Sequence, residues 1–400
     1  MSTARQTYLD WLRIAAIIGV LFFHSAMPFV AEWEWHIKNA ETSNLLMECN
    51  FFLSRFRMPL LFFISGAVAY FILQRKTASQ FIGIRFKRLF IPLVAGMLLT
   101  VPIQVYMERL KGGFSGSYWD FYPTIFTTGP YPTGNFSWHH LWFIAYLFVY
   151  DVVLAPVFKA CMLHKQRLSF FHWLAKGARI YLLILPSVVG YALLTLRFPQ
   201  THDLINDWCG LLYWFFFLLV GFICACFSPL LDSLERKRRL SLAIGFSTIV
   251  FINYLRWNQL EPDQVLPNWQ TDVRTYLYLS LYAITAWSWV FALIGYGKRY
   301  LNKKSPALAY INDAVYPFYI LHQTVIVVIA YYVVQTTDTI LLKYGFVVLA
   351  SFLSSMAIYH VFIRPVPFLR FLFGAKPLER KAPTVPEEKP AVKPALPLPV

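Results

Sequence analysis

The chain has 400 residues, of which 58% are hydrophobic and 14% are charged, and its mean hydropathy is +0.51. Soluble domains contain roughly 45–50% apolar and about 25% charged residues, so these proportions exclude a water-soluble enzyme and a disordered chain. The net charge of +16 does not indicate nucleic-acid binding, because basic residues in a membrane protein first record its topology. The composition predicts an all-α protein that crosses a lipid bilayer many times and has no nucleic-acid partner.

A bilayer-spanning helix needs about 20 mostly apolar residues, and we identify ten such runs in the sequence. They occupy residues 12–31, 56–73, 90–106, 140–161, 180–196, 210–230, 240–255, 275–296, 315–334 and 341–362. With the N-terminus placed inside the cell, the predicted cytoplasmic segments contain 25 Lys and Arg residues. The predicted outer loops contain 6, without Arg55, which borders the second span. Because cytoplasmic loops carry an excess of basic residues, we expect both termini to be cytoplasmic.

The composition changes at about residue 364. Nine of the 24 prolines lie beyond this point, together with a group of basic residues. Such Pro-rich segments lack the apolar residues that a packed core requires. The sequence therefore predicts a transmembrane domain over residues 1–363 and a basic, disordered cytoplasmic tail over residues 364–400.

The first span contains two ionisable residues, Arg13 and His24, which are costly inside a bilayer and are therefore functional candidates. They are eleven positions apart, so at about 100° per residue they share one helix face, ~16 Å apart along the axis. This spacing places Arg13 near the cytoplasmic surface and His24 in the outer half of the membrane. A neutral imidazole there is suited to act as a general base to a hydroxyl group. The alternative is an arginine that reaches to the membrane surface and a structural histidine.

Two further pairs of arginines lie at the ends of predicted spans. Arg85 and Arg88 share a helix face at the cytoplasmic surface, where guanidinium groups bind phosphates bidentately; ordinary topological anchoring is the alternative. Arg55 and Arg57 lie at the outer start of the second span. Because outer arginines oppose the positive-inside trend, substrate binding is one interpretation of this second pair, and a structural role is the other.

Several of these residues belong to a pattern that extends along most of the chain. Its parts are Arg13-x10-His24, the run from Arg57 to Gly66, Arg85-x-x-Arg88-x-x-x-Pro92, the run from His140 to Ile144, and the run from Tyr316 to His322. In this order, the pattern resembles the acyltransferase-3 family of membrane acyltransferases over about residues 6–362. It is most similar to the branch that modifies periplasmic glucans.

The resemblance implies a ten-helix enzyme of the bacterial inner membrane. Such an enzyme moves an acyl group, succinyl or acetyl, from cytosolic acyl-CoA to hydroxyl groups of an extracytoplasmic glycan. It further implies that His24 is the catalytic residue and that Arg13, Arg85 and Arg88 bind the acyl-CoA donor.

Other site residues are expected to contact the acceptor or to support the reaction. The expected substrate-binding residues are Arg55, Arg57, His140 and Trp142, and the expected supporting residues are Asp10, Ser25, Asp151 and His322. Ser25 is a candidate oxyanion donor, whereas His322, which we place in the cytoplasmic half of its span, is expected to support packing or donor binding. Many relatives have a Glu where this chain has Leu147, which leaves Asp151 or Asp10 as the acidic partner.

Two other functions stay open at this stage. A secondary transporter or flippase would use buried arginine and histidine residues as coupling or substrate sites. A non-catalytic component of a glucan synthesis or export complex would need none of the proposed chemistry. We expect no metal or prosthetic group, because the histidines show neither an H-E-x-x-H motif nor a metal-binding cysteine pair.

Overall fold

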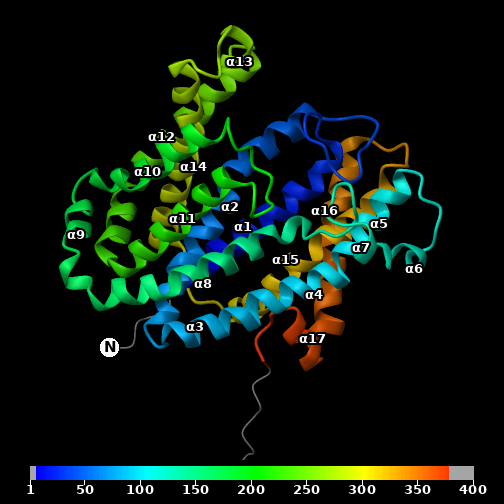
Figure 1. The fold of residues 1–400 in the computed structure, drawn as a ribbon, viewed down its shortest axis with the longest axis horizontal. Coiled ribbons are helices and arrows are strands. Elements are labelled where there is room, and N and C mark those ends of the chain that lie inside the picture. The colour runs from blue at the N-terminus through cyan, green and yellow to red at the C-terminus, as the bar shows by residue number, and fades with distance from the viewer. Residues whose placement is uncertain (1–5, 378–400) are drawn as a thin grey trace, which may run out of the picture.

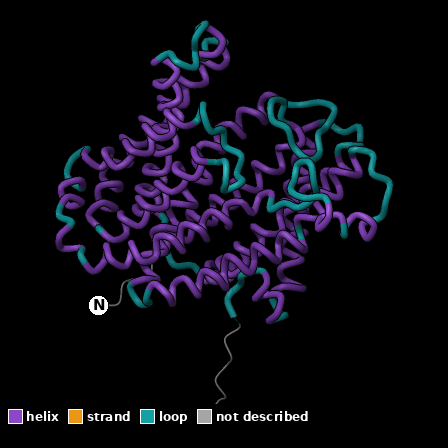
Figure 2. The backbone as a smooth tube through the Cα atoms, in the orientation of Figure 1, coloured by secondary structure: helices purple, strands orange, loops and turns teal. Residues whose placement is uncertain are grey.

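The computed structural model describes residues 6–377, and within this range the fold consists of helices and connecting loops (Figures 1 and 2). The α-helices are α1 (Thr7–Ala26), α2 (Asn44–Leu73), α3 (Ala78–Arg85), α4 (Ile91–Leu99), α5 (Val101–Lys111), α6 (Tyr118–Phe121), α7 (Thr124–Thr127), α8 (Trp142–Leu163), α9 (Phe170–Leu174), α10 (Leu185–Leu194), α11 (Trp208–Cys226), α12 (Ser228–Trp257), α13 (Pro262–Val265), α14 (Val273–Tyr300), α15 (Pro306–Val333), α16 (Ile340–Ile358) and α17 (Pro367–Leu372). Turns of π-helix, Phe86–Phe90 and Tyr359–Ile363, continue α3 and α16.

The described residues form nine helical segments that are long and apolar enough to cross a membrane. These segments correspond to nine of the ten predicted spans and confirm an all-α, multi-pass membrane protein. The remaining predicted span, residues 180–196, forms the shorter apolar segment Arg179–Leu194. Pro186 stands near the start of α10, and the residues before it form a 3-10 turn. Proline lacks a backbone N–H group and fits the first turn of an α-helix, so α10 begins at Pro186 and its neighbour Leu185.

The seventh predicted span is longer than expected. We predicted residues 240–255, whereas α12 begins at Ser228 and ends at Trp257. The charged residues that precede the apolar run continue the same helix. Figure 1 shows that α12 and α14 pack along each other and carry α13 beyond the other helices. Apolar side chains on the perimeter, such as Phe246 and Phe346, are more than half exposed, as expected for a surface that faces lipid.

Helix α1 lies inside the bundle, where it packs against α2, α14, α15 and α16. Thr7 at its start donates a hydrogen bond to Asn302 (2.9 Å), which places this end of α1 beside the start of α15. The buried Arg370 of α17 contacts Asp313 of α15. The two ends of the described chain therefore lie at the same end of the bundle, and its cytoplasmic orientation stays a prediction.

The segment after residue 364 differs from the expected disordered tail. It contains α17, and the guanidinium group of Arg370 donates hydrogen bonds to both carboxylate oxygens of Asp313 (3.1 and 2.8 Å). Both hydrogen bonds come from one nitrogen, Nη2. Charge-assisted bonds are stronger than neutral ones, and these hold residues 364–377 against the bundle. The remainder of the predicted tail, residues 378–400, lies outside the described residues.

Two glycines allow α2 and α11 to cross in backbone contact. A Cβ atom on Gly66 would lie 1.9 Å from the carbonyl oxygen of Leu218, and a Cβ atom on Gly221 would lie 2.0 Å from that of Phe63. Small residues at such crossings allow membrane helices to approach closely. The crossing fixes the position of α2, which carries Arg55 and Arg57.

We predict that Gly66→Ala lowers the free energy of unfolding by about 1–3 kcal/mol, because the added methyl group forces two backbones apart. The matched control is Gly83→Ala on α3, where an added Cβ atom has no neighbour within 4 Å. This control should be neutral or slightly stabilising. Thermal unfolding of the purified variants in detergent measures both effects. Equal midpoints for the two variants would contradict the close crossing.

Candidate active site

The inward face of α1 connects two cavities. Arg13 and Ile17 line one cavity, and Val20 and His24 line the other. These four positions are spaced by four, three and four residues, which is the spacing of one helix face. The structure therefore agrees with the shared face predicted for Arg13 and His24.

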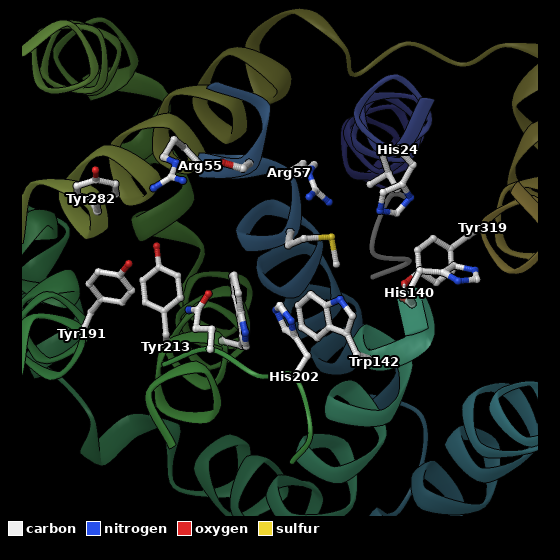
Figure 3. Close-up of a pocket in the computed structure, with 15 residues that line it drawn as sticks. His24, Arg55, Arg57, His140, Trp142, Tyr191, His202, Tyr213, Tyr282 and Tyr319 are labelled. Carbon is white, nitrogen blue, oxygen red and sulfur yellow. Dashed lines mark hydrogen bonds between the residues drawn. The ribbon is translucent and has the colours of Figure 1, made fainter. Parts of the chain in front are cut away.

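The cavity that contains His24, here called the outer cavity, has a volume of about 240 Å³. Its lining residues come from α1, α2, α8, α10, α11, α14 and α15 and from connecting segments (Figure 3). Its lining residues are Val20, His24, Ser54, Arg55, Arg57, Met58, His140, Trp142, Tyr191, Gln200, His202, Tyr213, Trp214, Tyr282 and Tyr319. The cavity brings together the predicted catalytic histidine and all four predicted substrate-binding residues. Sequence reasoning missed the tyrosines from α10, α11 and α14, which carry no motif.

The cavity that contains Arg13, here called the inner cavity, has a volume of about 260 Å³. It brings together all three predicted donor-binding residues, Arg13, Arg85 and Arg88. It also contains Gly374 and Lys376 from the segment that follows α17. Arg88 donates a hydrogen bond to the carbonyl oxygen of Gly374 (3.4 Å), so this C-terminal segment forms part of the cavity wall.

The two cavities meet at Tyr319 of α15, which lines both. The hydroxyl group of Tyr319 donates a hydrogen bond to the backbone carbonyl of His140. On α2 the boundary falls between Met58, which lines the outer cavity, and Leu61, which lines the inner one. A thin layer of side chains thus separates the arginine cluster from His24.

Three histidines from three different helical segments meet at this layer. His24 Nδ1 lies 2.9 Å from His322 Nε2, and the ring of His140 is 5.3 Å from that of His322, centroid to centroid. His322 was expected in the cytoplasmic half of its span, as a support for packing or donor binding. Because α15 begins at Pro306, before the predicted span, His322 lies past the midpoint of this helix and contacts His24. Its depth in the membrane stays a prediction.

The acidic candidates pair with arginines. Buried Asp151 lies 2.9 Å from Nε of Arg85, and Asp10 lies 3.2 Å from Arg13. Arg13 also donates a hydrogen bond to Asn312, a partner that sequence reasoning missed. Among the described residues, the contacts found for His24 include no carboxylate, so the proposed acidic partner of His24 is replaced by a second histidine.

Ser25 does not face either cavity. Its side chain is fully buried, and it is absent from the linings of both the outer and the inner cavity. Its hydroxyl group is buried and has no hydrogen-bond partner among the described residues. The cavity linings thus give no support to Ser25 as an oxyanion donor, and this role stays a prediction.

Arg55 and Arg57 enter the outer cavity without an acidic counterpart. The Arg57 guanidinium lies 3.5 Å from the centre of the Phe23 ring, and Arg55 packs against the rings of Phe51 and Tyr282. Within the described part of the chain, neither arginine forms an ion pair, and no Asp or Glu lines this cavity. A half-buried cation without a counterion is costly, so the outer cavity is suited to an anionic group.

His202, in the loop between α10 and α11, closes one side of the outer cavity. Its ring packs against Trp142, with centroids 4.2 Å apart and planes inclined by 31°. Burial, reinforced by the positive charge of Arg57, lowers the pKa of His202 to about 4. The ring is therefore neutral at physiological pH and adds no positive charge to the cavity. The sequence offered no signal for this contact, because it joins a loop to a distant helix.

The described residues contain no group of three or more His, Cys, Asp or Glu side chains arranged to hold a metal ion. The chemistry available at the cavities is therefore that of a histidine base, an unneutralised arginine pair and a separate cluster of arginines.

Comparisons with known proteins match nearly the whole chain. A family model described as an acyltransferase domain, acyltransferase-3, matches residues 6–360. Similar curated proteins are named glucans biosynthesis protein C and come from Escherichia coli strains SMS-3-5 / SECEC (25% identical), K12 / DH10B (24%) and O6:K15:H31 (25%). Each alignment covers 94% of this chain and 96% of the relative. No solved structure gives a significant match.

Proposed function

The chain belongs to the acyltransferase-3 family and is a membrane acyltransferase, and we propose that it transfers an acyl group from cytosolic acyl-CoA to a hydroxyl group of an extracytoplasmic glycan. The observation that carries this proposal is the pair of cavities that meet at Tyr319. The inner cavity contains three arginines and the outer cavity contains His24. The donor would therefore enter one cavity and the acceptor the other, and the two would meet at Tyr319.

The inner cavity is the proposed binding site of the acyl-CoA nucleotide. Arg13, Arg85 and Arg88 offer guanidinium groups that bind phosphate oxygens in a bidentate manner. Under the predicted topology, this cavity faces the cytoplasm of a bacterial cell, in whose inner membrane we place the protein. Arg13 and His24 stand ~16 Å apart along α1, which is similar to the length of the pantetheine arm. The arm would bring the thioester to Tyr319.

The proposed chemistry is general-base catalysis by His24. The histidine takes the proton of an acceptor hydroxyl as its oxygen attacks the thioester carbonyl. The new carbon–oxygen bond forms, the carbon–sulfur bond breaks, and the proton passes from His24 to the departing CoA thiolate. This sequence requires no metal ion or prosthetic group.

The proposed acyl group is succinyl, because the outer cavity contains two arginines without counterions. A succinyl group ends in a carboxylate, which would pair with Arg55 or Arg57, whereas an acetyl group has no charge to offer. An arginine–carboxylate pair in a desolvated site discriminates strongly between charged and neutral ligands.

The proposed acceptor is a periplasmic glucan. The shared name of the curated relatives supports a glucan, and the outer cavity has aromatic walls, formed by Trp142, Trp214, Tyr191, Tyr213 and Tyr282. Flat apolar rings with polar edges suit the faces of sugar rings. These walls explain how an uncharged sugar would bind beside two arginines.

We predict that His24→Ala lowers transfer of labelled acyl groups from acyl-CoA to glucan by ~10²–10⁴-fold, the usual contribution of a general base. Binding of acyl-CoA should stay unchanged, because the arginine cluster lies in the other cavity. The matched control is His360→Ala, at an exposed histidine outside both cavities, which should retain full activity. Wild-type transfer rates for folded His24→Ala would exclude the proposed role.

We predict that Arg88→Gln weakens acyl-CoA binding about tenfold or more, because it removes charge-assisted hydrogen bonds to phosphate. Lys87→Gln removes the same charge from the neighbouring exposed position and should leave the dissociation constant nearly unchanged. Isothermal titration of both variants with acyl-CoA compares them. Equal weakening would indicate a non-specific effect of surface charge and contradict the proposed donor site.

We predict that Arg57→Gln lowers the preference for succinyl-CoA over acetyl-CoA, expressed as the ratio of the two kcat/KM values, by about tenfold or more. Arg57→Lys keeps the charge and should retain part of the preference. Competition between differently labelled donors measures the ratio directly. An unchanged ratio in Arg57→Gln would exclude Arg57 as the residue that selects the acyl group.

A further inference from the structure

The hydrogen bonds around His322 determine which of its ring nitrogens carries a proton. His322 Nδ1 lies 2.6 Å from the backbone carbonyl oxygen of Tyr319, three residues earlier on α15. A carbonyl oxygen only accepts hydrogen bonds, so Nδ1 must be the donor. In a neutral imidazole the other nitrogen is then an acceptor, and Nε2 of His322 carries a lone pair.

This lone pair is directed at His24. The two ring planes are inclined by only 12° and their centroids are 5.1 Å apart, whereas the facing nitrogens are 2.9 Å apart. The centroid separation exceeds the nitrogen separation by about the width of one ring, so the rings meet edge to edge. Because His322 Nε2 accepts, His24 Nδ1 must donate. The lone pair of His24 is therefore on Nε2.

The third histidine does not compete for His24. His140 Nε2 donates to the carbonyl oxygen of Ile320 (3.1 Å), and its Nδ1 lies 3.4 Å from the amide nitrogen of Gln104. Gln104 is held in turn by Thr324 and Gln323. Both nitrogens of His140 thus have partners other than histidine. Of the three rings, His24 is the one that retains a nitrogen without a hydrogen-bond partner among the described residues.

We infer that His322 is a positioning residue that holds His24 in the tautomer with its lone pair on Nε2, where it accepts the proton of the acceptor hydroxyl. The inference rests on the proposed acyl transfer and adds an explanation of how the ring of His24 is oriented. Many catalytic histidines are oriented by a carboxylate; here a neutral imidazole, anchored on the backbone of its own helix, does so. A proton on His322 Nε2 would reverse the bond and move the lone pair of His24 to Nδ1.

Two amide substitutions separate this role from a packing role. The amide group of glutamine reaches the position of the imidazole Nε2, so His322→Gln can still accept a hydrogen bond from His24. The shorter asparagine places its amide at the position of Nδ1 and cannot. His322→Gln should therefore retain kcat within a few-fold of wild type. His322→Asn and His322→Ala should lose about 100-fold or more in kcat, with the KM for acyl-CoA unchanged.

The measurement is steady-state acyl transfer by the full-length protein in detergent or nanodiscs, with acyl-CoA titration as an independent check of folding. Equal rates for His322→Gln and His322→Asn, whether high or low, would overturn the inference. Loss of acyl-CoA binding together with kcat would overturn it as well, because the residue would then act through the fold. Retained transfer by His24→Ala in the same experiment would instead reject the proposed function.

Discussion

A bilayer interior tolerates charged side chains only where protein surrounds them, and this constraint determines how the helices are arranged. Several ionisable residues of the spans face inward around α1, where Arg13, Arg85 and Arg88 gather in one cavity and Arg57 and His24 in the other. The outward faces of α16 and of the apolar second half of α12 carry apolar side chains instead. The positions of the charges therefore define the site, and the apolar surfaces define the membrane around it.

The packing of the helices against one another sets the relative positions of these residues. The glycines of α2 and α11 bring the two backbones into direct contact, and α2 carries one side of both cavities. Helix α15 contributes Tyr319 and His322, one turn apart, so one helix supplies both the boundary between the cavities and the partner of His24. Small changes in helix packing would thus alter donor binding and base orientation together.

Features that depend on one helix at a time were predictable from the sequence. Hydropathy located nine of the spans, and the helical period placed Arg13 and His24 on one face, because both depend only on local order along the chain. Contacts between helices were not predictable in this way. The pairing of Asp151 with Arg85 and the contact of His322 with His24 join residues that lie far apart in the sequence. The polar first turns of α15 also hid the start of this helix. The motif resemblance grouped the site residues without assigning their partners.

The boundary at Tyr319 has a consequence for the permeability of the membrane. Under the predicted topology the two cavities open to opposite sides of the bilayer. If they joined through water, ions would leak across and the membrane potential would be lost. In the proposed reaction neither the nucleotide nor the sugar needs to pass, and only an acyl group of a few atoms changes sides. The side chains between the cavities, among them Tyr319 with its hydrogen bond to the backbone of His140, would then have to block ions while the proposed thioester reaches His24.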